Sequence, residues 1–144
     1  MGLTRAIHVA GAAFMLGGVT VHLLLRPAAA RAAETAQKAL YDLAWRVQVV
    51  MVMVGSAVLL VTGIALWLGE RFRLASGWLL LGVLLYVAVS ALDGAFLSPN
   101  LRRLRLAARS GQPVAAADAA GLTIQAITWF LLLVVVFLMT ARPF

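Results

Sequence analysis

Apolar and polar positions alternate along this chain in long blocks rather than with a short period. Four apolar blocks cover residues 6–25, 47–68, 78–97 and 122–140. Each has about the 17–25 residues that a helix needs to cross ~30 Å of hydrocarbon. A helix also satisfies all of its own backbone hydrogen bonds, as lipid requires. We therefore predict an all-α integral membrane four-helix bundle that occupies residues 1–144 as a single domain.

The connections between these blocks differ in length and carry most of the charge. Residues 28–46 predict a helix that lies at or rises from the interface and runs into the second membrane helix. Residues 99–109 alternate leucine with arginine, which indicates a second, basic interfacial helix before a turn at residues 110–113. A solvated charge run that only sets topology is the alternative. Charges, prolines and polar turns predict helix ends at Arg26-Pro27, Gly69-Glu70-Arg71 and Ser98-Pro99-Asn100.

Composition excludes a water-soluble domain and assigns the basic residues to topology. The chain is 64% hydrophobic and 12% charged, whereas soluble domains carry about 25% charged residues. The net charge of +7 lies between apolar runs rather than on one aromatic-rich face, so we expect bilayer lipid and not nucleic acid as the partner. The first and third connections carry eight basic residues, and the opposite face of the predicted bundle carries four. This asymmetry predicts a protein of the cytoplasmic (inner) membrane with both long connections in the cytoplasm and both termini outside.

The first membrane helix carries both histidines on one stripe. His8, Gly11, Met15, Gly18 and His22 follow one another in steps of three and four residues, so they share a helix face. The two imidazoles lie roughly 21 Å apart and cannot bind one metal ion. The stripe suggests b-type haem with His8 or His22 as the iron ligand, and a second ligand from a methionine or a partner in a homodimer. Copper held by methionines (Met15, Met51 and Met53) with a histidine, and plain helix packing, are the alternatives.

A second set of polar residues falls at one depth of the predicted bundle. His22, Asp93, Gln125 and Gln48, with Arg46 close by, lie ~6 Å inside the boundary that the arginines mark. We expect Asp93 to face the bundle interior and to contact His22, Gln125 or a loop arginine. The layer is interpreted either as a ligand or proton site or as a network that fixes helix register. Small and polar residues continue as packing seams on the second helix (Gln48, Gly55 and Thr62) and the fourth (Gly121, Gln125 and Thr128).

Several segments resemble a known family. They are His8-Val9-Ala10-Gly11-Ala12, Leu60-Val61-Thr62-Gly63-Ile64-Ala65-Leu66, Leu97-Ser98-Pro99-Asn100-Leu101-Arg102-Arg103-Leu104 and Met139-Thr140-Ala141-Arg142-Pro143. Together they resemble an uncharacterised family of predicted bacterial integral membrane proteins with four helices and about this length. The first helix is distantly similar to copper-resistance D-type domains and to haem-dependent protoporphyrinogen oxidases, which implies haem at His8. The oxidases' third-helix lysine has no counterpart, because Lys38 is the only lysine.

Two classes of function follow from these features. One is a b-type haem-binding or redox-linked membrane protein that uses the first-helix histidines. The other is a non-catalytic accessory or structural subunit of a larger membrane complex. The sequence favours a role without catalysis, and no residue is assigned as catalytic.

Overall fold

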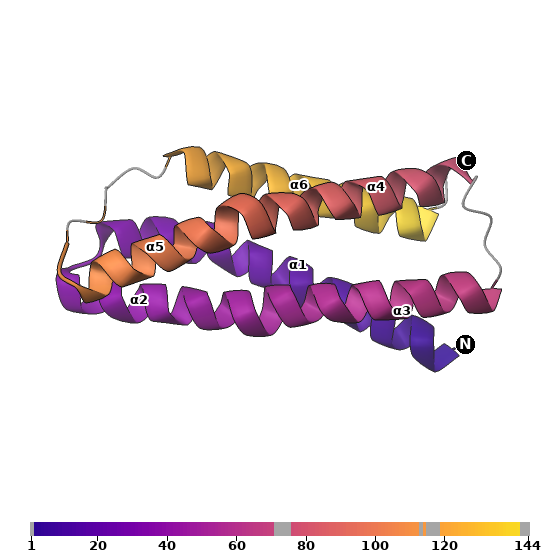
Figure 1. Cartoon of the computed structure of the whole chain (residues 1–144), viewed down its shortest axis with the longest axis horizontal. Helices are drawn as coiled ribbons and strands as arrows, with labels where there is room; N and C mark the ends of the chain where they lie inside the picture. The colour runs from indigo at the N-terminus through magenta and orange to yellow at the C-terminus, as the bar shows by residue number, and fades with distance from the viewer. Residues whose placement is uncertain (1, 71–75, 113, 115–118, 142–144) are drawn as a thin grey trace.

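The computed structural model describes residues 2–70, 76–112, 114 and 119–141, and these form α- and π-helices joined by short turns (Figure 1). Four helical spans among them are long and apolar enough to cross a membrane, which confirms the predicted all-α four-helix bundle. The elements are α1 (Gly2–Arg31), α2 (Glu34–Val47), η1 (Gln48–Met53), α3 (Val54–Glu70), α4 (Gly77–Leu92), η2 (Asp93–Leu97), α5 (Ser98–Arg109) and α6 (Ala119–Ala141).

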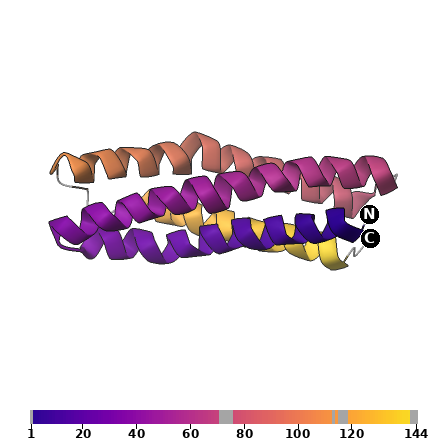
Figure 2. The same ribbon diagram turned by 90° about the horizontal axis from the view of Figure 1, so that it is seen from below.

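The helices join into two long rods and two single helices. α2, η1 and α3 follow one another without a break, and so do α4, η2 and α5 (Figure 1). α1 lies between α3 and α6, α4 packs on α6, and α2 packs on α5. The first and last described helical segments, α1 and α6, both reach the same end of the bundle, while α2 and α5 form the opposite end (Figure 2). We call that opposite end, formed by residues 25–47 and 98–112, the arginine-rich end.

The arginine-rich end projects beyond the membrane along the bundle axis. The rod of α2, η1 and α3 has 37 residues, or about 55 Å at 1.5 Å per residue, against ~30 Å of hydrocarbon. If Trp67 and Trp78 mark one hydrocarbon boundary, as interfacial tryptophans do, the other lies about 20 residues away, near Val47 and Ser98. α5, which was expected to lie in the interface, instead continues the line of α4 (Figure 1), and α2 rises into the second span, which is one of the two arrangements expected for residues 28–46. The predicted run of residues 28–46 into the second membrane helix is confirmed.

Two prolines that were expected to stop helices lie inside continuous helical structure. α1 runs past Pro27 to Arg31, because Ala29 is fully buried in the core of the arginine-rich end and this packing offsets the lost backbone bond. At the second site the helix switches to π geometry over Asp93–Leu97, and the Ser98 N–H donates to the Asp93 carbonyl five residues back. The wider π turn absorbs the missing donor of Pro99, so α4 continues into α5.

The turn predicted after α5 is confirmed at residues 110–112. Gly111 has φ +69°, a left-handed conformation that glycine adopts without a Cβ clash. The Gln112 N–H donates to the Ala107 carbonyl and the Gly111 N–H to the Ala108 carbonyl, which satisfies the last carbonyls of the helix. Pro113 lies outside the described residues.

Two separate apolar cores hold the molecule together. The first joins all four spans at mid-depth and consists of Met15, Val19, Val52, Val89 and Leu132. The second joins α1, α2 and α5 at the arginine-rich end and consists of Ala29, Tyr41, Ala44, Leu101, Leu104 and Ala108. Large apolar side chains that point outward from the spans, such as Val61, Leu84 and Phe137, are exposed as lipid-facing residues are.

Candidate functional site

The polar layer forms where the membrane spans meet the arginine-rich end. Gln48 is buried and its amide Nε2 donates to Asp93 Oδ2 at 2.8 Å and to Ser98 Oγ at 2.9 Å. The Ser98 hydroxyl in turn donates to Asp93 Oδ2 at 3.1 Å. These three side chains close a hydrogen-bonded triangle between the two long rods.

Both π-helical segments begin at members of this triangle. η1 starts at Gln48 and η2 starts at Asp93, and these two residues are hydrogen-bonded to each other. A π turn inserts an extra residue, which rotates the side chains that follow relative to a regular α-helix. In η2 this turn brings Ser98, five residues after Asp93, beside the Asp93 carboxylate, so that both side chains contact the Gln48 amide.

His22 and Arg26 extend the layer along α1. Both are buried, at 1% and 4% exposure, and Arg26 Nη1 donates to Gln125 Oε1 at the long distance of 3.5 Å. Gln48 lies beside the His22 ring, yet neither ring nitrogen has a hydrogen-bond partner among the described residues. Gln48 thus contacts Asp93 and lies beside His22, and Gln125 joins these residues through Arg26.

Two expected features of the layer are not found. Within the described residues the Asp93 carboxylate accepts from Gln48 and Ser98, and not from His22, Gln125 or an arginine. Arg46 is exposed on the outer side of α2 and does not join the layer. Arginine at the layer comes from α1 instead, because Arg26 lies one turn beyond His22 on the same buried face.

The small-residue stripe of α1 is in close contact with η1 and α3. A Cβ on Gly11 would lie 3.0 Å from Val58 Cγ1, and one on Gly18 would lie 2.8 Å from Met51 Cβ. Gly55 faces α1 across the same contact, and a Cβ on Gly55 would lie 3.0 Å from the Met15 backbone nitrogen. Met15 itself is 1% exposed. This packing leaves no room for a porphyrin edge on the stripe, so Gly11 and Gly18 serve the approach of two helices.

His8 lies at the other end of the stripe and has a defined tautomer. Its Nδ1 is 2.8 Å from Thr62 Oγ1, and that hydroxyl already donates to the Val58 carbonyl at 2.6 Å. The threonine has one hydrogen, so His8 Nδ1 must be the donor and His8 Nε2 keeps its lone pair. The half-buried His8 is therefore the histidine of the stripe whose ring is fixed by a side-chain hydrogen bond, and that bond does not use Nε2.

Among the described residues no three His, Asp or Glu side chains come together as a metal cluster would require. The methionines considered for copper also point apart, because Met15 is buried in the core and Met53 is 49% exposed. Met51 packs against Gly17 and Gly18. In this packing these residues do not form a copper site.

Two arginines of α5 form ion pairs with an aspartate of α2 at the arginine-rich end. The Asp42 carboxylate accepts from Arg109 Nη2 at 2.9 Å and from Arg105 Nε at 2.6 Å. Arg109 and Arg105 hold the pKa of the Asp42 carboxyl below its ordinary value of 3.8. Arg105 also stacks on Trp45, 5.6 Å from the ring centre. These contacts cross-link α2 to α5.

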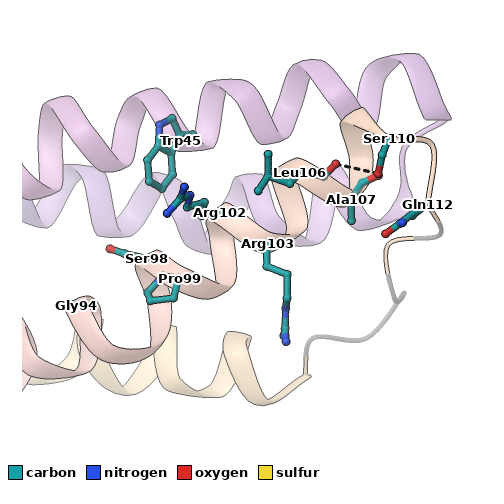
Figure 3. Close-up of a pocket in the computed structure, with 10 residues that line it drawn as sticks. All are labelled: Trp45, Gly94, Ser98, Pro99, Arg102, Arg103, Leu106, Ala107, Ser110 and Gln112. Carbon is teal, nitrogen blue, oxygen red and sulfur yellow. Dashed lines mark hydrogen bonds between the residues drawn. The ribbon is translucent and has the colours of Figure 1, made fainter.

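A groove beside this cross-link was not anticipated from the sequence. It runs along α5 and is lined by Trp45, Gly94, Ser98, Pro99, Arg102, Arg103, Leu106, Ala107, Ser110 and Gln112 (Figure 3). The arginine spacing in residues 102–109 was visible as a basic helix, but the pairing of Arg105 and Arg109 with an aspartate more than 60 residues away was not.

Comparison with known proteins identifies the family and nothing finer. No curated protein and no solved structure matches the chain. The comparisons therefore lend no support to the distant similarity with copper-resistance D-type domains or haem-dependent protoporphyrinogen oxidases. One family model, described as predicted integral membrane protein (DUF2269), matches residues 2–143. Since that match covers almost the whole chain, this protein belongs to that family of integral membrane proteins, and its described residues form four helices long and apolar enough to cross a membrane.

Proposed function

We propose that this protein is a non-catalytic accessory or structural subunit of a larger membrane complex. One observation carries the proposal: the carboxylates of Glu34, Asp42 and Asp93 are each engaged by side chains of the same chain. Asp93 binds Gln48 and Ser98, Asp42 binds Arg105 and Arg109, and Glu34 binds Lys38. A carboxylate held in this way fixes helix register rather than exchanging protons with a substrate. The polar layer then acts as a lock between the two rods.

We place this subunit in a bacterial cytoplasmic membrane with both termini outside. The eight basic residues of the first and third connections support this orientation, because the loops that stay in the cytoplasm carry the excess of Lys and Arg. The arginine-rich end would then project into the cytoplasm, where it is available to partners of the complex.

The mass of the native particle tests the accessory role. Membranes expressing the tagged chain at its natural level are extracted with styrene–maleic acid copolymer, which keeps the surrounding lipid. An accessory subunit is expected in particles that contain other protein chains at fixed stoichiometry, and Asp93→Asn, which keeps the shape of the side chain, should leave that stoichiometry unchanged. Particles that contain this 15.3 kDa chain alone would refute the proposal, and particles with two copies would indicate a homodimer.

The second candidate function is the binding of b-type haem through His8. It is supported by the His8–Thr62 hydrogen bond, which fixes the ring and leaves Nε2 free, as for many histidine ligands of metals. His22 is fully enclosed and is the matched control. When bound, haem would supply one-electron redox chemistry. The glycine stripe of α1 packs against η1 and α3 and has no space for the haem ring. The haem pocket and the second iron ligand would therefore have to come from another chain.

An absorption spectrum separates the two candidates. Protein purified from haem-replete cells should show a Soret band if the haem proposal is right, and His8→Ala should abolish it while His22→Ala leaves it in place. A colourless protein that takes up no added hemin would eliminate haem binding and leave the accessory role.

A further inference from the structure

The groove on α5 combines an apolar wall with two cationic side chains. Its volume is about 770 Å³. Trp45 from α2, with Pro99 and Leu106 from α5, supplies apolar surface, and Arg102 and Arg103 supply the charge. Figure 3 shows the Arg102 side chain reaching toward Trp45, while Arg103 extends from α5 on the other flank. An occupant of this groove should therefore be both anionic and partly apolar.

The two arginines of the groove differ from their neighbours on the same helix. Arg105 and Arg109 bind Asp42, whereas within the described part of the chain Arg102 and Arg103 contact no carboxylate. Both side chains are exposed. Arg105 also holds the Trp45 indole in place by stacking on it. Arg105 thus supports the Trp45 wall of the groove, and Arg102 and Arg103 remain to bind an anion from outside the described chain.

The depth of the groove selects the anion. α4, η2 and α5 form one helical rod, and Arg102 follows Trp78 by 24 residues, which is about 36 Å. Hydrocarbon of ~30 Å ends before that point, and the headgroup region extends the bilayer to about 40–45 Å in total. Arg102 and Arg103 therefore lie at the level of lipid phosphates. Trp45 lies at a similar depth, 22 residues or about 33 Å from Trp67.

Below the arginines the groove opens toward the hydrocarbon at Gly94. A Cβ built on Gly94 would meet nothing within 4 Å, so the surface there is open. Gly94 belongs to the π segment that also carries Asp93. An acyl chain that descends from a headgroup at Arg102 has apolar surface at Pro99 and free space at Gly94.

We propose that this groove binds one anionic phospholipid of the surrounding bilayer, with its phosphate at Arg102 and Arg103 and an acyl chain over Gly94. The site does not depend on the accessory role and would exist in either orientation of the protein. Basic pockets at the headgroup level between membrane helices recognise anionic lipids through the same combination of charge and apolar surface.

Lipid titration of the delipidated full-length protein tests the site. Binding of phosphatidylglycerol is followed by native mass spectrometry, with phosphatidylcholine and inorganic phosphate as comparison ligands. Each arginine near an anionic surface strengthens binding about fivefold, so Arg102→Gln with Arg103→Gln should weaken the first bound phosphatidylglycerol about 25-fold. The matched control, Arg31→Gln with Arg46→Gln, removes the same charge from exposed positions outside the groove. It should change the affinity for the first phosphatidylglycerol less than about threefold, since salt screens distant charges.

Gly94→Leu supplies an independent variant that keeps every charge. Its side chain fits without a clash and should fill the path of the acyl chain, so phosphatidylglycerol binding should weaken while helicity stays unchanged. Equal losses in both double variants would overturn the site in favour of diffuse charge attraction. Equal binding of phosphatidylcholine would indicate an unspecific lipid shell, and saturable binding of inorganic phosphate with no effect of Gly94→Leu would indicate a free-anion site; either result refutes the proposal.

Discussion

Removing the amide of Gln48 should destabilise the bundle more than any exposed substitution nearby. Gln48 is 2% exposed and donates two hydrogen bonds, to Asp93 and to Ser98. Side-chain hydrogen bonds in membrane proteins contribute about 0.6 kcal/mol on average and up to about 1.7 kcal/mol. The bond to the Asp93 carboxylate lies at the strong end, because charge-assisted bonds are roughly twice as strong as neutral ones. We expect Gln48→Leu to lower the free energy of unfolding by about 2–3 kcal/mol.

Unfolding by sodium dodecyl sulfate in mixed micelles, followed by tryptophan fluorescence, measures this loss. Val50→Leu is the matched control, because Val50 is 53% exposed two residues further along the same rod, and it should change stability by less than about 0.5 kcal/mol. Asp93→Leu tests the coupling. When both partners are replaced by apolar groups, neither the amide nor the carboxylate is left without its partner and only the Ser98 hydroxyl loses its two contacts, so the double variant should be more stable than the sum of the single losses predicts, by about 1–2 kcal/mol.

The outcome that would refute the reasoning is additivity. If the losses of Gln48→Leu and Asp93→Leu add within about 0.5 kcal/mol, the two side chains do not interact in the membrane. A loss for Gln48→Leu no larger than for Val50→Leu would show that the layer does not lock the rods. Either result would remove the main support for the structural role of the polar layer.

Three further predictions concern the seam, the arginine-rich end and the topology. Gly18→Ala should lower the free energy of unfolding by about 1–3 kcal/mol, because the added Cβ would lie 2.8 Å from Met51 Cβ. Gly94→Ala, where the added Cβ meets nothing within 4 Å, should instead raise it by about 0.5–1 kcal/mol. The reverse order of these two variants in the same detergent titration would contradict the packing. Because the pKa of Asp42 is lowered in the folded protein, its ionised carboxylate stabilises the fold at pH values above the ordinary pKa of 3.8, and this contribution is lost as the pH falls through the lower pKa of the folded state. The difference in stability between wild type and Asp42→Asn should therefore vanish in acid. A difference that does not depend on pH would argue against the ion pairs. In intact cells an impermeant maleimide should label Ser76→Cys and not Ser110→Cys, and since the chain has no native cysteine the opposite pattern would directly invert the proposed orientation.

The number and the buried faces of the spans could be predicted from the sequence because they depend on local properties. Transfer of about 20 apolar residues into lipid and the 3.6-residue period determine where a span lies and which residues share a face. Gln48, Gly55 and Thr62 are all buried, as their seven-residue spacing indicates. The common depth of the polar layer followed from the same arithmetic of rise per residue.

Long-range packing decided the features that local patterns misjudged. Pro27 would end an isolated helix, but burial of Ala29 in a core shared with Tyr41 outweighs the lost backbone bond. Pro99 is accommodated by the π segment that begins at Asp93, and a regular period cannot anticipate such a segment.

The partners of polar and small residues also depended on the tertiary structure. The sequence predicted that Asp93 faces the bundle interior, but its partners Gln48 and Ser98 could be identified only from the packing of the two rods. The glycines of α1 are equally suited to a porphyrin edge or to a neighbouring helix, and the approach of α3 determines that a helix occupies them. Asp42 likewise selects two of the four arginines of α5 across more than 60 residues of chain, because pair geometry and not composition sets which charges are neutralised and which remain to bind other molecules.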